Sequence, residues 1–214
     1  MSTCVIDNVT YTYKDPQAIS FANYCVKKVV FEGQDVFEDS YSVAWLKNFG
    51  EARLAIRWNV KKTERDKKLK NSKGYPKERW FVLPREITIL NKVIHLPLKG
   101  LRNEEMSNNA ISMQNTYISP DKVTSLPTTE YKLIKVVSEG TDVLGDSYSV
   151  AWLKNYGESR LAIRWNISKG EKNTPCIGYP YGGTKTKEPY WFVLPRGTTV
   201  LNGILVLPLE DHCK

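Results

Sequence analysis

Apolar and polar residues alternate over two neighbouring stretches of the chain. In residues 41–46, Tyr, Val and Trp alternate with Ser, Ala and Leu, and in residues 53–59 Leu, Ile and Trp alternate with Arg, Ala and Asn. A period of two is typical of β-strands. Residues 47–51 contain Asn and Gly, which favour a turn. The pattern therefore predicts a β-hairpin with one apolar face.

The same hairpin sequence occurs twice. Residues 39–59 and 146–166 are identical at 19 of 21 positions, and the motif Trp-Phe-Val-Leu-Pro-Arg follows each copy, at 80–85 and 191–196. Self-similarity of this kind is typical of repeat architectures. We therefore predict a mainly β protein built by tandem duplication. Each copy is expected to form a small curved sheet or partly open barrel of five or six strands, with little helix.

The repeat also predicts the domain boundaries. Residues 1–100 are interpreted as the first copy, 101–130 as a linker with the start of the second copy, and 131–214 as the second copy. Insertions separate the copies only between Asn59 and Trp80 and in the equivalent stretch. Variable length marks a surface loop. Short helices are expected only at 61–73 and in the linker.

Each copy ends in a second predicted hairpin. The pair Asn202-Gly203 lies between apolar runs, and such a pair favours a tight turn because both central residues need positive φ. The first copy has Asn91-Lys92 at this place, a weaker turn of the same kind. Earlier strands are expected near 26–31 and 133–137.

The apolar face of the repeated hairpin is the expected core of each unit. Its side chains alternate with the polar ones and therefore point to one side of the sheet. We expect most of their surface to be buried. They are Trp45, Leu54, Ile56 and Trp58, with Trp152, Leu161, Ile163 and Trp165 in the second copy.

The formal net charge is +8, which favours a polyanion or an acidic protein as partner. The first copy carries most of this excess, and its loop at 60–79 holds nine basic and three acidic residues. No apolar run approaches the length of a membrane span, so we expect no membrane partner and a cytoplasmic location. The four cysteines are not repeated and form no CxxC pair, so no metal site and no cofactor is expected.

The polar face of the hairpin offers the strongest candidate site. Arg53, Arg57 and Asn59 alternate along one strand and so point to the same side, opposite the apolar face. Two guanidinium groups about 13 Å apart along a strand can hold phosphates or carboxylates. The second copy repeats them as Arg160, Arg164 and Asn166. The alternative is that these arginines only pair with neighbouring carboxylates on a solvated sheet face.

Aromatic residues next to the variable loop complete the candidate set. Trp80 and Trp191 begin the second repeated motif, where they either stack on a ligand or belong to the core. Tyr75 and Tyr179 lie in repeated Gly-Tyr-Pro tripeptides within loops of different length. They either stack on a ligand or hold the loop against the core.

No motif in the sequence favours catalysis. The two histidines are not equivalent, and no phosphate-binding glycine loop, HExxH or GxSxG motif occurs. Shared carboxylates leave a metal-dependent nuclease as a third hypothesis. The favoured interpretation is a non-enzymatic protein, a covalent pseudo-dimer that binds nucleic acid or a nucleotide. The alternative is a protein that docks on another protein, such as an inhibitor encoded by a phage or mobile element.

Overall fold

The computed structural model shows a mainly β protein, as predicted from the sequence. It describes residues 1–6, 9–21, 24–48, 50–60, 80–99, 131–155, 157–169, 175–176 and 191–210. Within these ranges every regular element is a strand except η1 (Pro16–Ala18), a short 3₁₀ helix. No helix there is long and apolar enough to cross a membrane. Tyr75, Tyr179, the linker and the loop at 61–79, with the helices expected there, lie outside the described residues.

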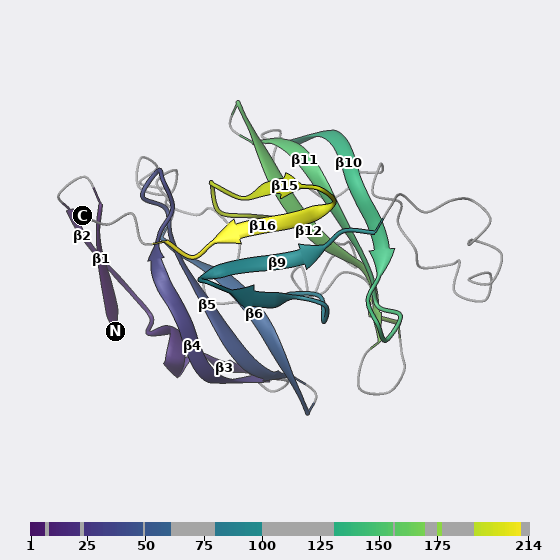
Figure 1. Ribbon diagram of the computed structural model, residues 1–214. Coiled ribbons are helices and arrows are strands. Elements are labelled where there is room, and N and C mark those ends of the chain that lie inside the picture. The colour runs from purple at the N-terminus through teal and green to yellow at the C-terminus, as the bar shows by residue number, and fades with distance from the viewer. Residues whose placement is uncertain are drawn as a thin grey trace, which may run out of the picture.

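Each repeat forms an antiparallel sheet around its long hairpin (Figure 1). The first sheet has the order β3 (Ser20–Phe21), β4 (Tyr24–Gln34), β5 (Ser40–Asn48), β6 (Glu51–Val60) and β7 (Phe81–Val82). The second contains β10 (Tyr131–Thr141), β11 (Ser147–Asn155) and β12 (Glu158–Lys169), and both β13 (Pro175–Cys176) and β14 (Phe192–Val193) pair with β12.

The two sheets have the same strand register. Lys28 pairs with Trp45 in the first, and Lys135 pairs with Trp152 in the second. Irregularities interrupt β4 and β10 at equivalent places, for example between Val26 and Lys28 in β4 and between Leu133 and Lys135 in β10. Bulges bend a strand and increase its twist. Because the bulges recur, the two sheets curve in the same way.

The last hairpin of each repeat leaves its own sheet and joins a shared one. The shared sheet has the order β15 (Thr199–Leu201), β16 (Ile204–Pro208), β9 (Val93–Pro97) and β8 (Thr88–Leu90). In Figure 1 it crosses in front of the two long-stranded sheets. The sequence had led us to expect each copy to keep these strands in a sheet of its own. They pair across the repeats because both hairpins have an apolar side to bury against the same core.

The shared sheet joins equivalent strands symmetrically. His95 pairs with Val206, which is its equivalent in the second repeat. Ile94 is equivalent to Leu205, and Leu96 is equivalent to Leu207. The neighbouring pairs, Ile94 with Leu207 and Leu96 with Leu205, are therefore converted into each other when the two repeats are exchanged. A register that maps onto itself in this way has a local twofold axis through its central pair.

The predicted tight turns are present in both hairpins of the shared sheet. Asn202 and Gly203 have φ values of 49° and 73°, and Asn91 and Lys92 have φ values of 50° and 59°. Two successive residues with positive φ are what a two-residue hairpin turn requires. Lys92 therefore adopts a conformation that is unfavourable for a residue with a Cβ atom.

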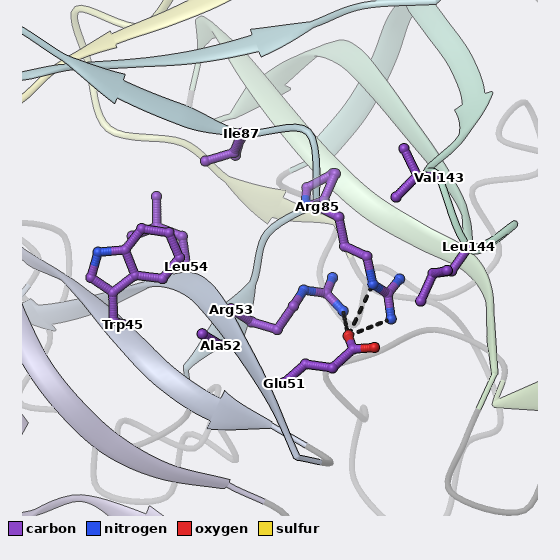
Figure 2. A pocket seen from close by; sticks show the side chains of 10 residues that line it. Trp45, Glu51, Ala52, Arg53, Leu54, Arg85, Ile87, Val143 and Leu144 are labelled. Atoms are coloured by element: carbon purple, nitrogen blue, oxygen red, sulfur yellow. Dashed lines mark hydrogen bonds and ion pairs between the residues drawn. The ribbon is translucent and has the colours of Figure 1, made fainter.

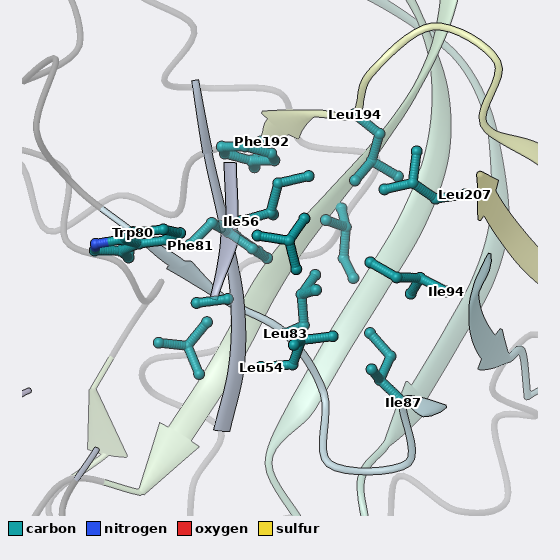
Figure 3. Close-up of a cluster of buried hydrophobic side chains, with 14 of the residues drawn as sticks. Leu54, Ile56, Trp80, Phe81, Leu83, Ile87, Ile94, Phe192, Leu194 and Leu207 are labelled. Atoms are coloured by element: carbon teal, nitrogen blue, oxygen red, sulfur yellow. The ribbon is translucent and has the colours of Figure 1, made fainter. Parts of the chain in front are cut away.

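One hydrophobic core contains residues of both repeats (Figure 3). Phe81 and its equivalent Phe192 stack with ring centroids 4.9 Å apart. Leu54 and Ile56, expected in the core, are buried in it. Trp58 is partly buried, and its indole Nε1 donates a hydrogen bond of 2.9 Å to the carbonyl oxygen of Val193. The core thus forms between the repeats as well as within each one.

An N-terminal hairpin covers part of the first repeat. It consists of β1 (Ser2–Ile6) and β2 (Val9–Tyr13). Gln34 donates from Nε2 to the carbonyl oxygen of Val5 at 3.0 Å, and the hydroxyl of Tyr13 donates to Glu32. These contacts bring the start of the chain against the strands of the repeated unit.

Candidate functional site

The arginine face predicted from the sequence is buried. Arg57 has an exposed fraction of 1%, and Arg53, Arg160 and Arg164 are also buried. The prediction that this face is solvated is wrong. Segments distant along the chain cover this face: Trp80 and the carbonyl of Lys14 lie against Arg57, and the carbonyl of Leu83 accepts from Arg53. Alternation along one strand identifies its two faces, but it does not show which of them other elements cover.

Two of these arginines contact Trp80 and Trp191, the two tryptophans that the sequence assigned either to a ligand contact or to the core. The guanidinium carbon of Arg57 lies 5.7 Å from the ring centroid of Trp80, and that of Arg164 lies 5.1 Å from the ring centroid of Trp191. Both tryptophans are buried. The candidate residues therefore come together as internal cation–π pairs and not as a surface open to a ligand.

The other arginines and the asparagines have internal polar partners. Arg53 donates from Nη2 to the carbonyl oxygen of Leu83 at 2.8 Å, and Arg160 makes the equivalent bond to Leu194 at 2.7 Å. Burial lowers the pKa of Arg53 below its usual value, and the nearby Arg85 adds to this effect. The amides of the asparagines donate to serine hydroxyls of the neighbouring strand. These bonds join Asn59 to Ser40 and Ser42, and Asn166 to Ser147 and Ser149.

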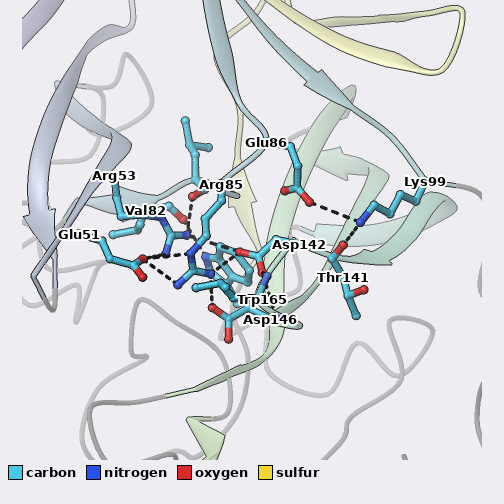
Figure 4. Close-up of polar contacts among 12 residues, drawn as sticks. Glu51, Arg53, Val82, Arg85, Glu86, Lys99, Thr141, Asp142, Asp146 and Trp165 are labelled. Carbon is cyan, nitrogen blue, oxygen red and sulfur yellow. Dashed lines mark hydrogen bonds and ion pairs between the residues drawn. The ribbon is translucent and has the colours of Figure 1, made fainter. Parts of the chain in front are cut away.

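A charged cluster joins the repeats at Arg85 (Figure 4). Its Nη1 lies 2.5 Å from Asp142 and 2.7 Å from Asp146, both on the second repeat, and its Nε lies 3.0 Å from Glu51 on the first. Burial acts to lower the pKa of Arg85, but hydrogen bonds to Asp146 and Asp142 outweigh it and raise the pKa. Arg85 thus remains charged and holds the second repeat against the first.

Arg196 makes the reciprocal contacts at the other end of the molecule. Its Nη1 lies 2.7 Å from Asp39, its backbone N–H donates to Asp35 at 2.9 Å, and its Nε donates to Glu158 at 3.0 Å. Burial raises the pKa of Asp35 in spite of the hydrogen bond from Arg196. Sequence reasoning missed these residues. The repeated motif ends in Arg, and two aspartates four residues apart are also repeated, which is the signal that would have found them.

A partly buried tryptophan lies next to two exposed lysines in the described part of each repeat. In the first, Trp45 is partly buried, exposed Lys28 pairs with it across the strands, and exposed Lys47 follows two residues along β5. Directly paired residues and residues two apart on a strand project from the same face. The second repeat has the same arrangement in Trp152, Lys135 and Lys154. We call each of these arrangements a tryptophan–lysine site.

A cleft of about 360 Å³ lies beside the first tryptophan–lysine site (Figure 2). Its apolar wall includes Trp45, Leu54 and Ile87 from the first repeat and Val143 and Leu144 from the second. The polar part of the wall comes from Glu51, Arg53 and Arg85. The cleft therefore lies where the two repeats meet, next to the charged cluster.

The polar groups of the cleft retain some hydrogen-bonding capacity. The Nε of Arg53 is buried and has no hydrogen-bond partner in the part of the protein that the structure describes. Glu51 has a side-chain exposure of 45% and contacts both arginines through Oε2. Within the described ranges, no group of three or more His, Cys, Asp or Glu residues is arranged to hold a metal ion.

Comparisons with known proteins provide no relative from which a function could be transferred. No family model matches the chain, and neither a curated protein nor a solved structure matches it.

Proposed function

We propose that this protein is a non-enzymatic binding protein for single-stranded nucleic acid. The observation that carries the proposal is the tryptophan–lysine site, which occurs at the same register in both repeats. Bases stack on aromatic side chains, which is worth about 1–3 kcal/mol per base, and neighbouring lysines attract the phosphates. The buried arginines favoured from the sequence have a structural role in this proposal.

The second repeat provides a second tryptophan–lysine site for the same nucleic-acid strand. The symmetric pairing of β9 and β16 supports the interpretation of the chain as a covalent pseudo-dimer. Two tryptophan–lysine sites on one chain raise the effective concentration of the strand at the second site once the first is occupied. A strand long enough to reach both sites is therefore expected to bind more tightly than a short one.

A charge-matched pair of variants tests the proposal. Lys28→Gln with Lys47→Gln removes the two exposed charges beside Trp45, whereas Lys14→Gln with Lys92→Gln removes two exposed charges outside the site. Binding of a labelled thymine oligonucleotide of about 12 nucleotides is measured by fluorescence anisotropy at several salt concentrations. We expect the first variant to lose affinity and to reduce the slope of log affinity against log salt by about 0.7 per lost phosphate contact.

Three outcomes would contradict the proposal. The first is that the unmodified protein does not bind the oligonucleotide at low salt. The second is that the two double variants lose the same amount of affinity, and the third is that tryptophan fluorescence does not change when the strand binds. The last outcome would leave binding by charge alone, without the stacking that defines the proposed site.

A protein partner is the second candidate function. It is favoured by two exposed apolar turns, Val36-Phe37 and Val143-Leu144, each next to one of the charged clusters. Exposed apolar residues that gather in one place mark protein contacts more often than isolated ones do. If the unmodified protein binds no nucleic acid, we expect it to retain a protein partner with an affinity that depends little on salt. Phe37→Ser with Leu144→Ser is expected to abolish this retention.

A further inference from the structure

We infer that the cleft beside Trp45 accepts a single unstacked nucleobase and that guanine fits it best. This inference rests on the proposed function, because the strand that carries the base is the ligand of the tryptophan–lysine site. It adds a selection for base identity, which stacking and phosphate contacts do not provide.

The shape and lining of the cleft fit a small flat ligand. Its volume of about 360 Å³ lies at the lower end of the range for small-molecule sites. Trp45 offers an aromatic surface on one side, and Val143 and Leu144 stand on the other side (Figure 2). An apolar pocket with a few polar groups is the usual form of a site that binds a flat ligand in one orientation.

The polar groups complement the edge of guanine. The Nε of Arg53 is a donor without a partner in the described part of the chain, and a ligand acceptor would relieve the cost of leaving it unpaired. Guanine offers acceptors at O6 and N7 and a donor at its amino group. Both arginines approach Glu51 at Oε2, and Oε1 has no hydrogen-bond partner among the described residues. Arg53 thus fits an acceptor of guanine, and Glu51 fits its amino group.

The charges around the cleft favour a base over a phosphate. Two guanidinium groups, of Arg53 and Arg85, face three carboxylates, of Glu51, Asp142 and Asp146. The cluster is therefore formally negative and repels a phosphate. Lysines lie on the other side of Trp45 and attract the backbone, so the base is the part of the strand that enters the cleft.

The two ends of the molecule differ at three positions that border the cleft: Ala52, Ile87 and Leu144 correspond to Ser159, Thr198 and Phe37. Of these, Leu144 lies next to the charged cluster of Arg85. Leu144 is equivalent to Phe37, and the ring centroid of Phe37 lies 4.4 Å from the guanidinium carbon of Arg196. An aromatic ring at this place thus covers the arginine of the charged cluster. Leu144 has no aromatic ring to place over Arg85, which is part of the cleft wall.

The substitution Leu144→Phe tests the inference by placing an aromatic ring beside Arg85, as Phe37 does beside Arg196. Leu201→Phe makes the same change at a remote exposed leucine and serves as the control. The probes are thymine oligonucleotides with and without one central guanine. We expect the unmodified protein and the control to bind the guanine probe about 10-fold more tightly, as one specific base contact allows. Leu144→Phe is expected to remove this preference and to leave the affinity for the all-thymine probe within about twofold.

A second variant keeps the test independent of how the phenylalanine packs. Glu51→Gln replaces the carboxylate and is expected to reduce the guanine preference with little effect on the all-thymine probe. Equal affinity of the unmodified protein for the two probes, or an unchanged preference in both variants, would overturn the inference and leave the proposed function standing. Failure of both probes to bind the unmodified protein would overturn the proposed function together with the inference.

Discussion

Arg57 and Arg164 are among the largest side chains that are completely buried in this protein. Each lies against a buried tryptophan of its own repeat, which provides a weakly polar surface for a planar cation. Arg57 also donates from Nη2 to the carbonyl oxygen of Lys14 at 3.4 Å, and this bond connects the repeat to the N-terminal segment. These arginines therefore contribute to the stability of the fold and do not form a ligand-binding surface.

Arg57→Ala is expected to lower the free energy of unfolding by about 3 kcal/mol or more. The change removes a buried cation–π pair and the donor to Lys14, and it leaves a cavity beside Trp80. Lys27→Ala, at an exposed position, is expected to change the free energy by no more than about 0.5 kcal/mol. Denaturant unfolding measures both values. Equal values for the two variants would show that Arg57 is not part of the core.

Tyr13 and Tyr148 predict a loss of stability at alkaline pH. Burial raises the pKa of both, and the hydrogen bond to Glu32 adds to the effect at Tyr13. A tyrosine with a raised pKa holds its proton more tightly in the folded state. Its contribution to stability is therefore complete below about pH 10, the unfolded value, and is lost as the pH rises through the folded value.

The variant Tyr148→Phe measures this effect at one site. It loses the hydrogen bond from the hydroxyl to the carbonyl oxygen of Pro97, so its melting temperature is expected to be slightly lower at neutral pH. Above about pH 10 its melting temperature should fall less steeply than that of the unmodified protein. Tyr11→Phe is the control. An alkaline decline that is the same in all three proteins would exclude Tyr148 as a cause.

At the scale of elements, the two hairpins of the shared sheet form the same type of turn with different residues. Asn202-Gly203 uses a glycine for the second positive φ, and Asn91-Lys92 uses a lysine. The turn carbonyls are also used in the same way. The backbone N–H of Leu98 donates to Gly203, and that of Leu209 donates to Lys92, each at 2.7 Å.

Lys92→Gly is expected to stabilise the protein by about 1 kcal/mol. Glycine removes the steric cost of a side chain at positive φ, which exceeds the added entropy of the unfolded chain at such a site. The backbone carbonyl that accepts from Leu209 is unchanged. Gly203→Lys is the reverse substitution and is expected to destabilise by a similar amount. Thermal melting of both variants measures the effect, and a loss of stability in Lys92→Gly would contradict it.

At the scale of the whole molecule, most contacts between the repeats occur in equivalent pairs. The hydroxyls of Tyr41 and Tyr148 donate to the carbonyl oxygens of Pro208 and Pro97. Trp165 donates from Nε1 to Val82 at 2.7 Å, the counterpart of the bond from Trp58. A surface that complements its own equivalent is the property of a twofold interface.

A fragment of residues 1–99 is therefore expected to form a homodimer. β9 of one copy would pair with β9 of the other around His95, in the register that β9 and β16 adopt in the complete chain. Alone, the fragment would expose the half of the core that Phe192, Leu194 and Leu207 cover. Light scattering after size-exclusion chromatography measures its mass. A folded monomer would show that one repeat is stable without its equivalent.

The sequence by itself determined the strands, the repeated hairpin and the tight turns. These features depend on residues that are neighbours along the chain, so alternation and turn chemistry are sufficient to predict them. The same rules placed Leu54 and Ile56 in the core, because an apolar face must be buried wherever the strand lies. The repeat also predicted that the register of the first sheet would recur in the second.

Only the tertiary structure decided which polar face is buried and where a ligand can bind. Arg57 is covered by Trp80 and by the N-terminal segment, and Arg85 reaches carboxylates of the other repeat. These partners lie far apart in the sequence, and the alternation of a single strand contains no information about them. Because an open strand face and a covered one have the same pattern, the tryptophan–lysine sites became visible only after the sheets were assembled.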